Sequence, residues 1–172
     1  SKVVHFKLDG VEETVSTSAS GTLQSYVIAP QSHGAHLLEV WITATINNTE
    51  VETDHIFKDI IWYDETSEDA VIGCIYRSDY YSEARDNNEK EPGKVYVRQY
   101  DTTAIVYHVF DPTTNFPVVS RYVDGELVGT NTVTESQNVW NFQTDETGVH
   151  TLKIVVRDTE VTILVDVTEL GI

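Results

Sequence analysis

Residues 3–15 read Val-Val-His-Phe-Lys-Leu-Asp-Gly-Val-Glu-Glu-Thr-Val. Apolar Val4, Phe6 and Leu8 alternate with polar neighbours, which is the period of a strand that buries one face. Asp9-Gly10 then supplies a two-residue hairpin turn, because both residue types tolerate the positive φ that this turn needs. The chain returns through residues 11–15. This stretch therefore predicts an antiparallel β-hairpin.

The hairpin recurs 115 residues later, where Val118-Val119 precede Asp124-Gly125 as Val3-Val4 precede Asp9-Gly10. Two further blocks match at an offset of 114 residues. Gln24-Ser25-Tyr26-Val27-Ile28 matches residues 138–142, and Gly34-Ala35-His36-Leu37-Leu38 matches residues 148–152. The shared order is a hairpin, an aromatic-centred strand, a Gly-x-His turn, a long strand and a final strand. Three blocks in register predict two homologous units in tandem.

Strand-like alternation continues through the rest of the chain. The predicted strands also span residues 38–44, 56–63, 70–76, 94–100, 104–110, 118–123, 127–134, 139–143, 149–157 and 161–167. No segment has the apolar stripe of a helix, and β-branched residues dominate the apolar runs. The predicted fold class is all-β, with two immunoglobulin-like antiparallel β-sandwich units in tandem.

We expect the first unit over residues 1–65 and the second over residues 66–172. Three strands precede the second hairpin, and nothing equivalent precedes the first. The first unit is therefore expected to lack its opening strands, which leaves unpaired backbone and an uncovered core. Either the chain extends upstream or another subunit donates the strands. We favour the first explanation, because a half-open sandwich is costly and a boundary imposed on a longer chain explains it. The Ser-Lys start and the absence of methionine indicate a processed product or an excised piece.

Composition argues against several classes of partner. The chain has 28 acidic and 11 basic residues, a net charge of −17, which repels phosphate backbones and anionic lipid headgroups. Nucleic acid is therefore not an expected partner. Membrane insertion is not expected either, since no apolar run approaches the roughly 18 residues of a membrane span. Cys74 is the single cysteine, so no intrachain disulfide can form, and its apolar surroundings predict a core residue.

No catalytic residue and no metal site is predicted, and we do not expect an enzyme. The sequence contains neither a Gly-x-Ser-x-Gly elbow nor a glycine-rich phosphate loop, and its six histidines lack zinc-ligand spacing. His36 and His150 occupy equivalent repeat positions, which indicates a structural role at the strand entry. No cofactor is expected, and calcium is the one alternative left open, at residues 86–89 or at residues 64–69.

Trp41 is the first candidate for a ligand or partner contact. It has the polar-side parity of its strand, so we expect it to be exposed and to stack on a sugar ring or a protein. Burial between the two units is the alternative. Trp62 and Trp140 are assigned to the core.

Residues 77–93 are the longest stretch without strand periodicity and predict a long polar loop. Within it, Tyr80 and Tyr81 are flanked by Arg77 and Arg85. Tyr and Arg supply contact area at modest entropic cost, so these four residues are candidates for recognition. A flexible acidic connector is the alternative interpretation.

Four runs of the second unit carry a likeness to known proteins: Tyr-His-Val-Phe-Asp-Pro at 107–112, Arg-Tyr-Val-Asp-Gly at 121–125, Val-Trp-Asn-Phe at 139–142, and Gly-Val-His-Thr-Leu-Lys-Ile-Val-Val at 148–156. They resemble the tandem immunoglobulin-like modules of large tailed-phage virion proteins and bacterial surface adhesins. The resemblance covers residues 100–168 well and the first unit more loosely.

This resemblance implies a non-catalytic structural or adhesive module, located on a virion or extracellularly at a cell surface. Its partners would be other subunits of the assembly or a glycan. The alternative function is a carbohydrate-binding accessory domain of a secreted enzyme, with Trp41 or the Tyr80-Tyr81 loop as its platform. Such modules specify a fold better than a function.

Overall fold

The computed structural model describes residues 2–17, 21, 24–77, 94–135 and 137–170. These residues form thirteen strands and no helix, which confirms the predicted all-β class. No part of them is a helix long and apolar enough to cross a membrane. In chain order the strands are β1 (Lys2–Leu8), β2 (Val11–Thr17), β3 (Gly34–Ile46), β4 (Thr49–Glu52), β5 (Ile56–Trp62), β6 (Val71–Arg77), β7 (Lys94–Arg98), β8 (Thr103–Phe110), β9 (Val118–Val123), β10 (Glu126–Thr132), β11 (Gln137–Phe142), β12 (Gly148–Val156) and β13 (Thr159–Thr168).

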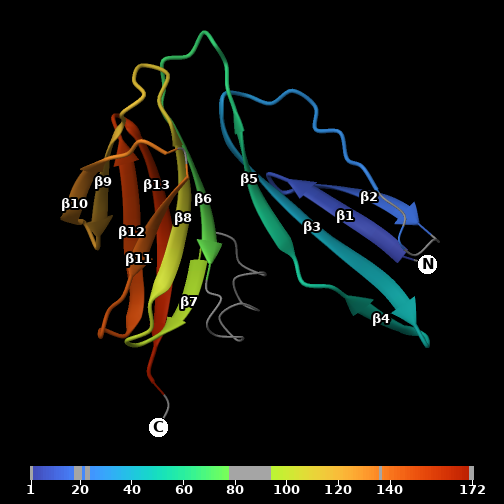
Figure 1. Ribbon diagram of the computed structural model, residues 1–172. Helices are drawn as coiled ribbons and strands as arrows, with labels where there is room; N and C mark the ends of the chain where they lie inside the picture. Colours follow the sequence, from blue (N-terminus) through green and yellow to red (C-terminus); the bar gives the residue numbers. More distant parts are fainter. Residues whose placement is uncertain (1, 18–20, 22–23, 78–93, 136, 171–172) are drawn as a thin grey trace.

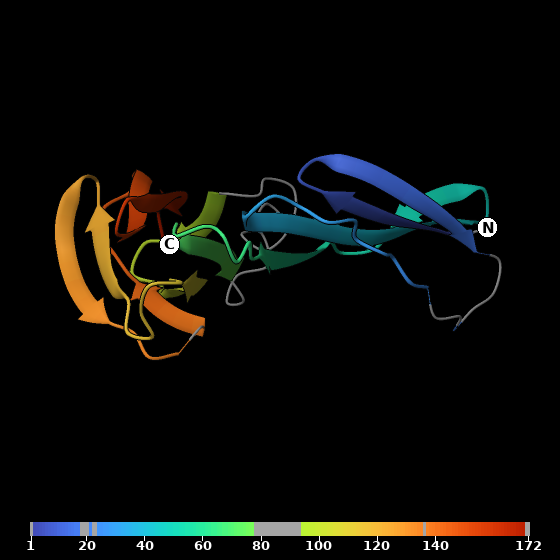
Figure 2. The ribbon, with the colours of Figure 1, turned by 90° about the horizontal axis from the view of Figure 1, so that it is seen from above.

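The strands form two groups (Figure 1). We call β1 to β5 the open sheet, in the order β2-β1-β3, with β4 and β5 sharing the far edge of the long strand β3. We call β6 to β13 the sandwich, because they form two facing sheets. Seen from above, the open sheet extends away from the sandwich (Figure 2).

The sandwich has the two-sheet arrangement of an immunoglobulin fold. One sheet has the order β11-β8-β6 and the other the order β10-β9-β12-β13-β7. Its core is a continuous apolar cluster in which Ile105 and Tyr107 of β8 face Leu152 and Ile154 of β12. The predicted immunoglobulin-like sandwich is therefore confirmed. One pairing differs from the predicted antiparallel sheets, since β7 runs parallel to β13. The strands β6 and β7 belong to different sheets.

Both hairpins of the internal repeat turn through the same backbone conformation. The φ angles are 48° and 86° at Asp9-Gly10 and 49° and 86° at Asp124-Gly125. Two consecutive positive φ values are what a type I′ turn requires, and this turn matches the twist of the flanking strands. The Asp-Gly pairs are therefore a shared local cause of the two hairpins.

The repeat also preserves strand register. Leu8 pairs with Leu38 across β1 and β3, and Val123 pairs with Leu152 across β9 and β12. The offsets between these pairs are the 115 and 114 residues that separate the sequence blocks. The β2-β1-β3-β5 part of the open sheet is thus the counterpart of the β10-β9-β12-β13 part of the sandwich. A counterpart of the facing β11-β8-β6 sheet is absent among the described residues.

Residues 24–28 were predicted as a strand, and this prediction is wrong. Their counterpart β11 pairs with β8, whereas the described part of the open sheet has no equivalent of β8 to supply a backbone partner. The segment still keeps its position over the sheet. Tyr26 stacks on Phe6 with ring centroids 4.8 Å apart, as the Arg121 guanidinium lies 5.6 Å from the Trp140 ring.

The connection between β5 and β6 joins the two groups. Tyr63 packs edge-on against Phe110 of β8, with ring centroids 4.7 Å apart. Nε2 of His33, the residue before β3, lies 3.0 Å from the Asp69 carbonyl oxygen. The predicted boundary after residue 65 falls within this connection and stays a prediction.

Candidate functional site

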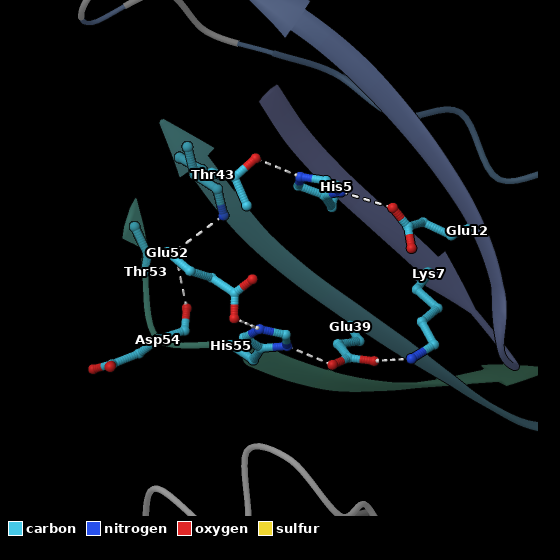
Figure 3. Close-up of polar contacts among 10 residues, drawn as sticks. His5, Lys7, Glu12, Glu39, Thr43, Glu52, Thr53, Asp54 and His55 are labelled. Atoms are coloured by element: carbon cyan, nitrogen blue, oxygen red, sulfur yellow. Dashed lines mark hydrogen bonds and ion pairs between the residues drawn. The ribbon is translucent and has the colours of Figure 1, made fainter. Parts of the chain in front are cut away.

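Ionisable side chains on one face of the open sheet bond to one another across neighbouring strands (Figure 3). Directly paired residues on antiparallel strands share a face, and the register pairs His5 with Trp41 and Lys7 with Glu39. The apolar Val4 and its same-face neighbours occupy the opposite side. We call the group the polar cluster: His5, Lys7, Glu12, Glu39, Trp41, Thr43, Glu52 and His55.

Trp41 is the centre of the polar cluster, because an imidazole covers each side of its indole ring. The His5 ring lies 4.7 Å from it at an interplanar angle of 6°, and the His55 ring lies 4.5 Å from it at 7°. Aromatic stacking of this kind adds to the burial of apolar area. Only 8% of Trp41 is exposed.

Trp41 therefore lies on the polar face, as its parity predicts, but the expectation that it is exposed is wrong. Its neighbours on β1 and at the start of β5 cover both ring faces, which are the surfaces that would stack on a sugar. Of the tryptophans assigned to the core, Trp140 is buried and Trp62 is half-buried.

His55 bonds to two carboxylates of the polar cluster. Its Nδ1 lies 2.5 Å from Glu39 and its Nε2 lies 3.0 Å from Glu52. Both nitrogens face carboxylates, and both can donate only when the ring is protonated. Burial works against this charge, but the hydrogen bonds to Glu39 and Glu52 outweigh it and raise the pKa of His55. Buried Glu39 also pairs with Lys7 at 3.1 Å.

His5 links the remaining members. Its Nδ1 lies 2.7 Å from Glu12 on β2, and its Nε2 lies 2.8 Å from the Thr43 hydroxyl on β3. The polar cluster therefore connects β1, β2, β3, β4 and the residue before β5 through side chains. Its acids and bases are bonded to one another, so the arrangement supports a proton-sensitive contact between strands.

A second polar arrangement occurs once in each group of strands, and we call it the Asp–His clamp. In the open sheet, Asp9 accepts hydrogen bonds from Nδ1 of His36 at 2.6 Å and from the Leu37 N–H at 2.9 Å. Nε2 of His36 donates to the Ser32 carbonyl oxygen at 2.9 Å.

In the sandwich, Asp124 accepts from Nδ1 of His150 at 2.8 Å and from the Thr151 N–H at 2.7 Å, while His150 Nε2 lies 3.1 Å from the Glu146 carbonyl oxygen. Burial opposes protonation of His150, but the bonds to Asp124 and Glu146 outweigh it and raise its pKa. The Thr151 N–H and His150 lower the pKa of Asp124. The predicted structural role of the two equivalent histidines is confirmed.

The other predicted recognition residues lie outside the described residues. Arg77 ends β6, but its side chain is not described, and Tyr80, Tyr81 and Arg85 fall within residues 78–93. The predicted loop at 77–93 falls almost wholly in the same stretch. These residues stay predictions. The side chain of Cys74 on β6 is likewise outside the description.

Two segments were predicted as alternative calcium sites. Residues 86–89 lie outside the described residues. In the other candidate, Asp64 accepts hydrogen bonds from the Thr66 N–H at 2.8 Å and from the Thr66 hydroxyl at 2.7 Å, which lower its pKa. In the part of the chain that is described, no group of three or more His, Cys, Asp or Glu side chains is placed to hold a metal ion.

Sequence reasoning missed the polar cluster. The only available signal was that His5, Lys7, Glu39 and Trp41 all have the polar parity of their strands. Parity places residues on a face, but the register between strands decides which of them meet. That register is set by the pattern of buried apolar side chains and by the geometry of the turns.

No protein-family model matches the chain, and no curated protein matches it. Among solved structures, the fibronectin(III)-like modules of Clostridium thermocellum CbhA are similar, with a TM-score of 0.37 and 14% identity over 97% of this chain and 78% of that one. Domains 4 and 5 of the S-layer protein SbsC give 0.32 and 13% over 79% and 66%. A 1.5-MDa bacterial ice-binding adhesin gives 0.38 and 14% over 97% and 54%. Identities and TM-scores this low assign the chain to no family.

Proposed function

We propose that this chain is a non-catalytic structural or adhesive immunoglobulin-like module of a virion or cell-surface assembly. The observation that carries the proposal is the tandem use of one framework. The open sheet and the sandwich share the Asp-Gly turn, the strand register and the Asp–His clamp. Tandem copies of a rigid framework hold attachment points at a fixed separation, and this task needs no reactive group.

The proposed partners are other subunits of the assembly, with glycan recognition as a further possibility for the loop at 77–93. The net charge of −17 supports partners that are neither nucleic acid nor anionic lipid. An extracellular or virion location follows from this role. The polar cluster is consistent with a structural role, since the carboxylates of Glu39 and Glu52 bond to His55.

The location is tested with antibodies raised against the purified chain. Immunogold labelling is carried out on intact, unpermeabilised source cells and on particles purified from them. We expect labelling at the outer surface or on the particles. Labelling that requires permeabilisation would contradict the proposal.

A carbohydrate-binding accessory domain receives no support from Trp41, because both faces of its ring are already covered. The remaining platform for that alternative is Tyr80 and Tyr81. A glycan array tests this platform. Binding that is lost in Tyr80→Ala or Tyr81→Ala, with an unchanged melting curve, would show that the loop at 77–93 recognises glycan, and an absence of binding would leave the accessory domain without a platform.

A further inference from the structure

The apolar face of the open sheet is less covered than the same positions in the sandwich. Three core residues of β12 have 0% exposure: Leu152, Ile154 and Val156. Their counterparts on β3 are Leu38, Val40 and Ile42, of which the first two are half-buried and Ile42 is 36% exposed. The strand pairings are equivalent, so the difference lies in what covers each face.

Further exposed apolar side chains extend this face. Leu8 pairs with Val11, Val40 with Ile56 and Ala44 with Val51, so all of these residues point to the same side. The exposed members are Val11, Ile42, Val51 and Ile56. Exposed apolar side chains that share one face of a sheet are typical of an interaction surface.

The backbone next to this face also has no strand partner among the described residues. Residues 24–28 lie across it through the stacking of Tyr26 on Phe6, and the structure gives them no strand pairing. Their counterpart β11 pairs antiparallel with β8 from Phe142 opposite Thr103 to Gln137 opposite His108. The sandwich thus shows what completes this arrangement, namely an extended strand with apolar side chains at alternate positions.

We propose that the open sheet receives one strand from another polypeptide, which lies antiparallel to residues 24–28 as β8 lies along β11. Its inward side chains are apolar, like Ile105, Tyr107 and Val109 of β8, and they cover β3, because the apolar side chains of β1 on this face are already buried. Backbone hydrogen bonds to residues 24–28 supply affinity, and alternate apolar side chains supply specificity.

One strand fits better than a complete second sheet, because the β5 edge is polar. Lys58 pairs with Leu38 and occupies the position that Ile163 holds in the sandwich. Ile163 is fully buried and Lys58 is exposed. Covering an unpaired ammonium group is costly, so the added strand ends before β5. The source of the strand, a further subunit, rests on the proposed assembly role, but the binding itself does not.

The test uses a synthetic peptide with residues 101–112 of this chain, which contain β8. The peptide is titrated into the isotope-labelled whole chain, and amide exchange and chemical shifts are followed. We expect saturable binding in the micromolar range. Amides of residues 24–28 should gain protection, and the melting temperature of the open sheet should rise by about 5 °C at saturation. Signals of Trp41, on the opposite face, should change little.

Two controls match this experiment. A peptide with Ile105→Asp and Val109→Asp should not bind, because it places charges on the apolar face. The chain variant Ile42→Lys should bind the original peptide about tenfold more weakly or worse, while Val149→Lys, at an exposed position of the sandwich, should bind normally. Unchanged melting of the free variants checks that both fold, and the exchange data do not depend on either variant.

Four results would overturn the proposal. The first is an absence of binding at millimolar peptide, and the second is a set of shift changes confined to the sandwich. The third is self-association of the chain through this face that the peptide does not reverse. The fourth is a longer natural form of the chain that protects residues 24–28 without peptide. Each leaves the surface-labelling experiment interpretable, so failure of the strand and failure of the assembly role are distinguished.

Discussion

Replacement of Asp124 by Asn tests the Asp–His clamp of the sandwich. Asn tolerates the positive φ of this position and can still accept the Thr151 N–H. Its NH2 group, however, faces Nδ1 of His150, so this ring stays neutral and its Nδ1 accepts a hydrogen bond instead of donating one. The substitution therefore keeps the number of hydrogen bonds and removes the charge attraction.

The expected loss is about 1 kcal/mol in the free energy of unfolding at pH 6. A hydrogen bond to a charged group is worth about 1.5–3 kcal/mol and a neutral one about 1 kcal/mol. The Asp124 side chain is 49% exposed, so solvent screening places the difference at the low end. For a domain of this size the melting temperature should fall by about 4–8 °C.

The pH dependence gives the sharper result. The pKa of His150 is raised above its ordinary value of 6.5, so its contribution is fully present below that pH and is lost as the pH rises through the folded-state pKa. The pKa of Asp124 is lowered, so its contribution is present above about pH 4 and is lost in acid. At pH 9 the neutral His150 has one proton for two acceptors, and the difference between the native chain and Asp124→Asn should approach zero.

Urea unfolding at pH 6 and pH 9 measures this difference. Fluorescence of Trp140 reports on the sandwich alone in a background with Trp41→Phe and Trp62→Phe. Asp158→Asn, in the exposed turn between β12 and β13, is the matched control because it removes the same charge away from the clamp. A loss of equal size at both pH values, or one no larger than that of the control, would refute the reasoning.

Three further predictions concern the polar cluster and the repeated turn. Glu39→Ala should destabilise the open sheet by about 2 kcal/mol at pH 6, because Lys7 and His55 lose a shared buried partner. The loss of stability should shrink at high pH as His55 deprotonates. Urea titrations measure it, and a loss independent of pH would contradict this. Trp41→Ala should cost the open sheet about 3 kcal/mol, which calorimetry can measure, and a cost below about 1 kcal/mol would mean that the ring is not packed. Gly125→Ala should cost about 1 kcal/mol, because its φ is +86°, and an unchanged unfolding midpoint would exclude strain there.

Features that depend only on residues close together in the chain were predicted from the sequence. Alternation of period two marks a strand wherever one face is buried, and Asp9-Gly10 and Asp124-Gly125 mark hairpins by their own backbone preferences. The repeat gave the equivalence of His36 and His150 before their hydrogen bonds were known. The short strand β4 after Asn47-Asn48 was missed, since four residues carry too little periodicity.

The sequence by itself thus determined the all-β class, the turns, the repeated framework and the face on which each strand residue lies. Tertiary structure decided which residues meet. It buried Trp41 between His5 and His55, and it left residues 24–28 without the pairing that β11 has. The physical reason is that parity and turn preference are local properties of the backbone, whereas burial and strand pairing require a partner that a distant segment must supply.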